Sequence, residues 1–138
     1  MLLSTWDGEP SKGPRPLRII VADDERDTAL TLTMILRDEG HDARAVHSGR
    51  NVMSAVIDTD PDAVLVDINM PDMSGWQVAQ TIRARSRKHP LLIGISGVYT
   101  KTSDKVLASI SGFHHYLVKP YPPAELLKLL EPLRSPTA

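Results

Sequence analysis

Short apolar runs alternate along this chain with segments of helical periodicity, and this alternation most limits what the chain can fold into. Apolar runs typical of buried strands lie at residues 17–24, 41–48, 63–68, 91–96 and 114–120. Helical spacing follows each run, at residues 26–39, 49–60, 74–86, 101–111 and 122–133. Repeated strand–helix units form a parallel sheet with helices on both faces and right-handed crossovers. The pattern therefore predicts an α/β, doubly wound three-layer sandwich with five parallel strands, (βα)5.

Residues that start or stop helices support these boundaries. Gly40 stands where the first helix should end, and Ser48 is a candidate N-cap for the second. Pro61 lies beyond the end of that second helix, and the prolines at 122 and 123 suit the first turn of the last helix.

Length and composition exclude several classes of site. The chain has 138 residues, a formal net charge of −1 and no cysteine. The length fits one domain, and the lack of cysteine excludes disulfides, thiolate zinc sites and cysteine nucleophiles. The charge gives no reason to expect a nucleic-acid partner, and no segment is typical of a signal peptide or a membrane span. We expect a cytoplasmic domain over residues 17–134, a flexible tail at 1–16 and a short tail at 135–138.

Polar side chains stand at the ends of four of the five predicted strands. The carboxyl ends of parallel strands share one edge of the sheet, where ligands of open α/β sheets bind. We therefore expect these side chains to meet there: Asp23, Asp24, Asp67, Ser96 and Lys119.

This set of side chains is typical of phosphoryl chemistry. Three carboxylates in one crevice repel one another unless a cation joins them, and a small set of hard oxygen ligands suits Mg²⁺. Lys119 supplies a mobile positive charge, and Ser96 supplies a hydroxyl donor. Asp67 ends the central strand, so it is the candidate nucleophile that becomes an aspartyl phosphate. Taken alone, Asp23 and Asp24 are equally explained as an N-cap for the helix that begins near Arg26.

Four motifs in order resemble those of the response-regulator receiver domain of two-component signalling, the CheY-like superfamily. They are "VADDE" (21–25), "VDINMPDMSG" (66–75), "GIS" (94–96) and "YLVKP" (116–120). The resemblance covers residues 17 to about 134. It implies a flavodoxin-like sandwich with strand order 2-1-3-4-5.

The resemblance also implies roles for single residues. Asp67 matches the phosphoacceptor, which also belongs to the metal site. Asp24 matches the direct Mg²⁺ ligand, and Asp23 the acid that more often acts through water. Asn69 matches the position whose backbone carbonyl is a further ligand. The remaining matches are the switch hydroxyl Ser96, the switch aromatic Tyr116 and the phosphate-contacting Lys119.

Other matched positions concern loop geometry and phosphoryl lifetime. The bond between Lys119 and Pro120 is typically cis in the family, and Gly75 matches the turn that opens the third helix. Asn69 and Val98 match the two positions that tune self-dephosphorylation. Serine stands at the switch position where threonine is commoner, and Gly97 follows where alanine is common, which eases access by small phosphodonors or water.

The implied function is a phosphorelay switch rather than an enzyme. Asp67 takes a phosphoryl group from a histidine kinase or a histidine phosphotransfer protein, with self-phosphorylation from small donors and autodephosphorylation as its only reactions. Ser96 then moves toward the phosphoryl group, Tyr116 turns inward, and the face of the fourth helix, fifth strand and fifth helix changes its contact with a downstream protein. The resemblance also allows a phosphorylation-dependent homodimer.

Two alternatives remain. The stretch "GFHHYLVKP" (112–120) is similar to receivers attached to hybrid histidine kinases, so the chain could be a module excised from one. An Mg²⁺ phosphatase of the haloacid-dehalogenase type also uses a strand-end aspartate and a lysine. That class needs a second aspartate two residues after the nucleophile, where this chain has Asn69.

Overall fold

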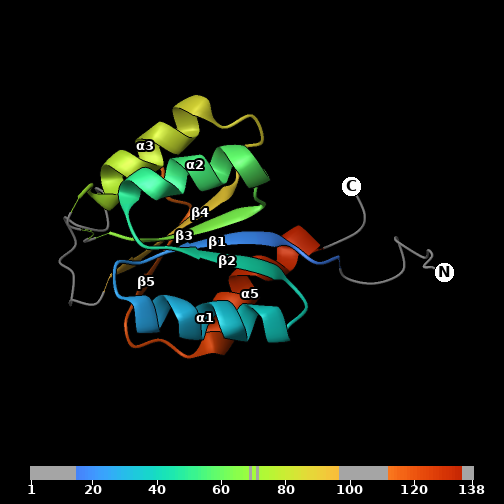
Figure 1. Ribbon diagram of the computed structural model, residues 1–138. Coiled ribbons are helices and arrows are strands. Elements are labelled where there is room, and N and C mark those ends of the chain that lie inside the picture. Colours follow the sequence, from blue (N-terminus) through green and yellow to red (C-terminus); the bar gives the residue numbers. More distant parts are fainter. Residues whose placement is uncertain (1–14, 69, 71, 97–111, 135–138) are drawn as a thin grey trace.

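The computed structural model describes residues 15–68, 70, 72–96 and 112–134 (Figure 1). The predicted helix at 101–111 lies outside these residues, as do Asn69, Gly97 and Val98 with the roles predicted for them. The predicted tail at 135–138 and nearly all of the one at 1–16 also lie outside them.

Five parallel strands form one sheet in the order β2-β1-β3-β4-β5, as predicted. Each neighbouring pair is parallel, and the strands are β1 (Arg18–Ala22), β2 (Asp42–Val46), β3 (Ala63–Asp67), β4 (Leu91–Ser96) and β5 (His115–Val118). All five residues of β3, the central strand, are buried. The flavodoxin-like order is therefore confirmed, and its switch point falls between β1 and β3.

Four described helices cover the two faces of the sheet. They are α1 (Arg26–Asp38), α2 (Gly49–Thr59), α3 (Gly75–Arg85) and α5 (Pro123–Arg134). In Figure 1, α2 and α3 lie on one face and α1 and α5 on the other. No helix in the described part of the chain is long and apolar enough to cross a membrane.

Alternation along the strands divides the core into two apolar layers. In β1, Ile20 packs in the layer under α2 and α3, whereas Ile19 and Val21 pack in the layer under α1 and α5. Successive strand residues point to opposite faces, so each buried strand supplies both layers. Each fully buried aliphatic side chain contributes about 1.5–3 kcal/mol to stability.

The predicted helix boundaries are largely confirmed. Ser48 caps α2, with its side chain accepting a hydrogen bond from the Asn51 amide at 3.2 Å. Gly40 follows α1 with a φ of 94°, a left-handed conformation that favours glycine. The N-cap of α1 is Glu25, whose side chain makes no capping bond, so Asp23 and Asp24 are not the predicted N-cap.

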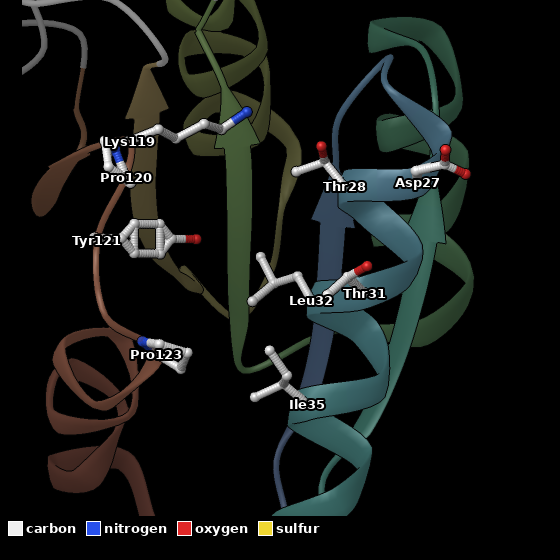
Figure 2. A pocket seen from close by; sticks show the side chains of 9 residues that line it. All are labelled: Asp27, Thr28, Thr31, Leu32, Ile35, Lys119, Pro120, Tyr121 and Pro123. Carbon is white, nitrogen blue, oxygen red and sulfur yellow. The ribbon is translucent and has the colours of Figure 1, made fainter.

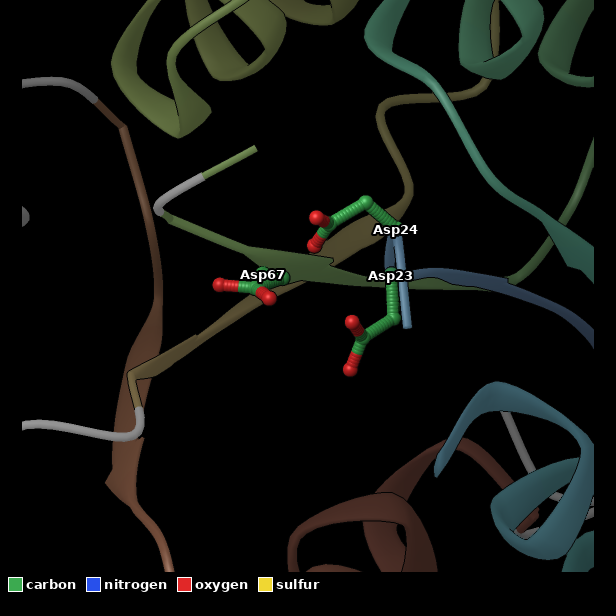
Figure 3. A group of neighbouring side chains, drawn as sticks. All are labelled: Asp23, Asp24 and Asp67. Carbon is green, nitrogen blue, oxygen red and sulfur yellow. The ribbon is translucent and has the colours of Figure 1, made fainter. Parts of the chain in front are cut away.

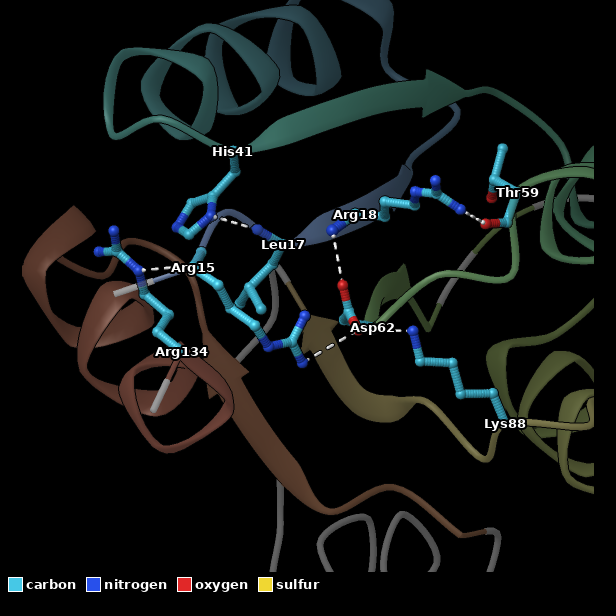
Figure 4. A network of polar contacts seen from close by, with 8 residues as sticks. All are labelled: Arg15, Leu17, Arg18, His41, Thr59, Asp62, Lys88 and Arg134. Carbon is cyan, nitrogen blue, oxygen red and sulfur yellow. Dashed lines mark hydrogen bonds and ion pairs between the residues drawn. The ribbon is translucent and has the colours of Figure 1, made fainter. Parts of the chain in front are cut away.

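The amino-terminal edge of the sheet carries a polar network around Asp62 (Figure 4). Asp62 is buried just before β3 and pairs with Lys88 at 2.7 Å and with Arg15 at 3.4 Å. Its second oxygen accepts the Arg18 amide at 2.8 Å. Nearby, Nδ1 of the buried His41 accepts the Leu17 amide at 3.0 Å. These groups satisfy backbone donors at the start of β1.

Candidate phosphoacceptor site

The five predicted side chains stand at the carboxyl edge of the sheet, opposite the Asp62 network. Asp67 is the last residue of β3 and Ser96 the last of β4. Asp23 and Asp24 follow β1, and Lys119 follows β5. The β1–β3 and β3–β4 pairings bring these strand ends side by side.

Three carboxylates converge between β1 and β3 (Figure 3). One oxygen from each of Asp23, Asp24 and Asp67 lies within 4.8 Å of the others. Asp23 and Asp67 are buried, whereas Asp24 is exposed. Like charges this close are unfavourable in a partly desolvated site, and a bound cation would relieve their repulsion.

Lys119 reaches this cluster from β5. Its Nζ donates to Oδ2 of Asp23 at 3.1 Å, and its backbone amide donates to the carbonyl of Ser96 at 2.7 Å. The bond between Lys119 and Pro120 is cis, as the family resemblance predicted. Lys119 therefore brings a positive charge to the three carboxylates from a backbone that is itself tied to β4.

Asp23 is held by several neighbours. Its Oδ1 accepts the Glu25 amide at 2.9 Å, while Oδ2 faces Lys119. Its own amide donates to the carbonyl of Val46 at 3.1 Å, and a ring nitrogen of His47 lies 3.1 Å from its carbonyl oxygen. The position of this carboxylate is therefore set by β2, by the turn into α1 and by Lys119.

The donor set fits a magnesium ion. Mg²⁺ takes hard oxygen ligands, tolerates few from the protein and keeps several waters. Asp23, Asp24 and Asp67 offer such oxygens close together, and their three negative charges exceed the one positive charge of Lys119. The described residues thus present an acidic group that fits the Mg²⁺ implied by the family resemblance.

Three further predicted residues have distinct settings. Tyr116 is half-buried against the apolar layer under α2 and α3. Gly75 opens α3, and a Cβ there would lie 2.6 Å from the Cα of Ile68, so only glycine fits. The Ser96 side chain is buried. Asn69 and Val98 are outside the described residues, so their assigned roles stay predictions.

The segment after Asp67 has anchors that the sequence did not reveal. Ile68 donates its amide to the carbonyl of Ile95 at 2.9 Å, and Gly75 donates to the carbonyl of Ile68 at 2.9 Å. Asp72 accepts amides from Gly49 and Arg50 at the start of α2. No local pattern links residues 72 and 49, so sequence periodicity alone could not find this contact.

A groove of about 420 Å³ runs beside the site between α1 and the segment after β5 (Figure 2). Leu32 and Ile35 form its α1 side, and Tyr121 and Pro123 form the other. Burial, and secondarily the charge of Asp23, raises the pKa of Tyr121 to about 12, so this phenol stays neutral. Lys119 lines one end of the groove, which therefore adjoins the acidic cluster.

Comparisons with known proteins agree on one family. Residues 19–131 match the family model of the response regulator receiver domain. The chain is 37% identical over 110 residues to the DNA-binding response regulator MtrA of Mycobacterium tuberculosis, covering 80% of this chain and 47% of that protein. It is 31% identical over 116 residues to the transcriptional regulatory protein PrrA of Mycobacterium leprae, covering 84% of this chain and 49% of that protein. The chain thus spans about half the length of these curated relatives.

A solved structure supports the same fold. The chemotaxis protein CheY4 of Vibrio cholerae superposes with a TM-score of 0.79 at 24% identity, covering 86% of this chain and 98% of that one.

Proposed function

The chain belongs to the response regulator receiver family of two-component signalling, and we propose that Asp67 is its phosphoacceptor. The donor is a phosphorylated histidine on a kinase or a histidine phosphotransfer protein. The expected localisation is cytoplasmic, where such kinases present their phosphohistidine.

One observation carries the proposal. Asp67 lies at the end of the central strand with Asp23 and Asp24, one carboxylate oxygen of each lies within 4.8 Å of the others, and Lys119 pairs with Asp23. A structural role does not explain three acids at one point, because their repulsion opposes folding. A site that binds Mg²⁺ and a phosphoryl group does explain it.

Each side chain has a chemical task in the transfer. An oxygen of Asp67 forms the new bond to phosphorus while the phosphorus–nitrogen bond of the donor breaks, and the imidazole nitrogen keeps the electron pair and takes a proton. Asp23, Asp24 and Asp67, with the carbonyl of Asn69, would hold Mg²⁺, which when bound neutralises charge on the phosphoryl oxygens. Lys119 offers a positive charge to those oxygens, and its flexible stem lets the ammonium move over from Asp23.

The readout follows from the new charge at Asp67. Phosphorylation adds three acceptor oxygens, toward which the Ser96 hydroxyl turns. Tyr116, half-buried next to β4 in this structure, then moves further into the space that Ser96 vacates. We propose that this shifts the population between two packings and changes the face formed by β5 and α5. A partner protein, or a second copy of the chain, reads that face.

Intact mass spectrometry after incubation with acetyl phosphate and Mg²⁺ tests the proposal. We expect the native chain to gain one phosphoryl group, and we expect no gain for Asp67→Asn or when EDTA replaces Mg²⁺. Transfer from a phosphorylated histidine phosphotransfer protein extends the test to the natural class of donor. Equal phosphorylation of Asp67→Asn and native chain would refute the assignment.

A further inference from the structure

The segment that leads from Asp67 into α3 is tied to the start of α2 through Asp72. Oδ1 of Asp72 accepts the Gly49 amide at 2.9 Å, and Oδ2 accepts the Arg50 amide at 3.3 Å. These two residues lie more than 20 positions earlier in the chain. The contact joins the loop of one strand–helix unit to the helix of the preceding unit.

The start of α2 is well suited to receive this carboxylate. The first amides of a helix have no partner within the helix, and the helix dipole favours negative charge at that end. Ser48 takes only the third of these amides, that of Asn51. Asp72 takes the first two, and the bond from Gly49 is the main reason that the pKa of Asp72 lies below its usual value. The carboxylate is therefore charged at neutral pH.

A second contact holds the same junction. A Cβ at Gly49 would lie 2.4 Å from the Cβ of Met73, a separation that side chains do not reach. The absence of a side chain at Gly49 therefore lets the backbone next to Asp72 approach α2 closely. The polar contact of Asp72 and the packing of Met73 fix this segment independently of the acidic cluster.

The junction is connected to Asp67 by a short series of described contacts. Met73 is followed by Ser74, which forms a capping box with Gln77 at the start of α3. Gly75 donates its amide to the carbonyl of Ile68 at 2.9 Å. Because Ile68 directly follows Asp67, a displacement of this junction would move the backbone that carries the Asp67 carboxylate.

We propose that Asp72 is a positioning residue for the phosphoacceptor. It anchors residues 72–75 to α2, keeps the backbone at Ile68 in place and thereby holds the Asp67 carboxylate at its distance from Asp23 and Asp24. This inference rests on the proposed function, because it assigns Asp72 a part in the same Mg²⁺ and phosphoryl site.

Calorimetric titration of the full chain with Mg²⁺ alone tests the inference, with circular dichroism confirming that each variant is folded. Residues that hydrogen-bond metal ligands typically contribute about 10- to 100-fold to metal affinity. Asp72 acts one step further from the metal, so we expect Asp72→Ala to bind Mg²⁺ roughly fivefold more weakly. Asp72→Asn should be intermediate, since its single carbonyl oxygen replaces one of two acceptors. Asp58→Ala, which removes an exposed acid elsewhere on α2, is the matched control and should bind like the native chain. Native affinity in folded Asp72→Ala would overturn the inference.

Amide hydrogen exchange separates this inference from the proposed function. We expect faster exchange at Ile68 and Gly75 in Asp72→Ala, with Val78 in the body of α3 unchanged. A native chain that binds no Mg²⁺ would count against the proposed function. The Asp72 inference would then be decided by exchange, and unaltered rates at Ile68 and Gly75 would overturn it.

Discussion

The two edges of the sheet both carry buried aspartates, but the negative charges of these aspartates are balanced to different extents by nearby cations and hydrogen-bond donors. At the amino-terminal edge, Asp62 faces two cations, Lys88 at 2.7 Å and Arg15 at 3.4 Å, and accepts the Arg18 amide. At the carboxyl edge, Asp23 and Asp67 are buried close to a third acid, and Lys119 pairs with Asp23. One edge balances its charge within the chain, and the other accumulates negative charge.

This difference separates a structural carboxylate from the three carboxylates that we propose form the phosphoryl site. Burial alone would raise the pKa of Asp62, but the hydrogen bonds from Lys88 and the Arg18 amide, with the charges of Lys88 and Arg15, hold it below its usual value. The charged form of Asp62 therefore stabilises the fold. The acids at the other edge repel one another, a cost to stability of the kind that proteins retain at functional sites.

Removing the compensated carboxylate should produce the largest loss of stability. Asp62→Ala leaves the Arg18 amide and two cations without their acceptor, so we expect the free energy of unfolding to fall by about 2–4 kcal/mol. Urea denaturation measures this change. If the free energy of unfolding fell by no more than in an ordinary surface substitution, Asp62 would have no structural role.

A substitution at the opposite edge should affect metal binding instead. Asp24 is exposed, and we propose it as the direct Mg²⁺ ligand, so Asp24→Asn should weaken Mg²⁺ binding about tenfold or more while the fold stays intact. Calorimetric titration gives the affinity. As a control, folded Asp62→Asn should bind Mg²⁺ with the affinity of the native chain. An equal loss of Mg²⁺ affinity in both variants would contradict the distinction between the two edges.

Acid should weaken the amino-terminal edge through its histidines. His41 and His114 accept the Leu17 and Leu92 amides through Nδ1, at 3.0 and 2.9 Å, which requires an unprotonated Nδ1. Desolvation of the ring first, then Arg134 for His41 and Arg83 for His114, lowers both pKa values below the usual range of histidine.

The direction of the pH effect follows from these lowered values. Near pH 6.5 the unfolded chain binds more protons than the folded chain, so stability falls as the pH drops from neutral through that region. Urea midpoints measured across this range should decline less in His41→Asn, whose amide oxygen can accept the Leu17 amide at any pH. An equal decline in this variant would show that His41 is not responsible.

The smallest effect should come from the exposed partner of Asp62. The Arg15 side chain is 44% exposed, and ion pairs of this kind contribute about 0.2–1 kcal/mol. We expect Arg15→Ala to lower the free energy of unfolding by no more than this, with the difference vanishing at high salt. A larger, salt-independent loss would indicate that the bond between the Arg15 amide and the Arg134 carbonyl is disrupted as well.

The sequence predicted the carboxyl edge better than the amino-terminal edge. Periodicity and capping residues predicted the helix boundaries at Ser48 and Gly40, and the family motifs predicted the strand order. The rule that parallel strands share an edge predicted which side chains meet there: Asp23, Asp24, Asp67, Ser96 and Lys119. The Asp62 network and the Asp72 contact could not be predicted, because they join residues that are distant in sequence and lie in no periodic pattern. Such contacts depend on how loops pack, which local residue preferences do not determine.

The central claim is that the three carboxylates at the carboxyl edge repel one another in the folded chain, and that this destabilising arrangement serves to bind Mg²⁺. Urea unfolding of the native chain and of Asp67→Asn, each with EDTA and with saturating Mg²⁺, tests this most directly. With EDTA, Asp67→Asn should be more stable by roughly 0.5–2 kcal/mol, because one repelling charge is gone. With Mg²⁺, the native chain should gain more stability than the variant, because the ion binds the folded state through Asp67. Equal stabilisation of both chains by Mg²⁺, or of neither, would contradict the account.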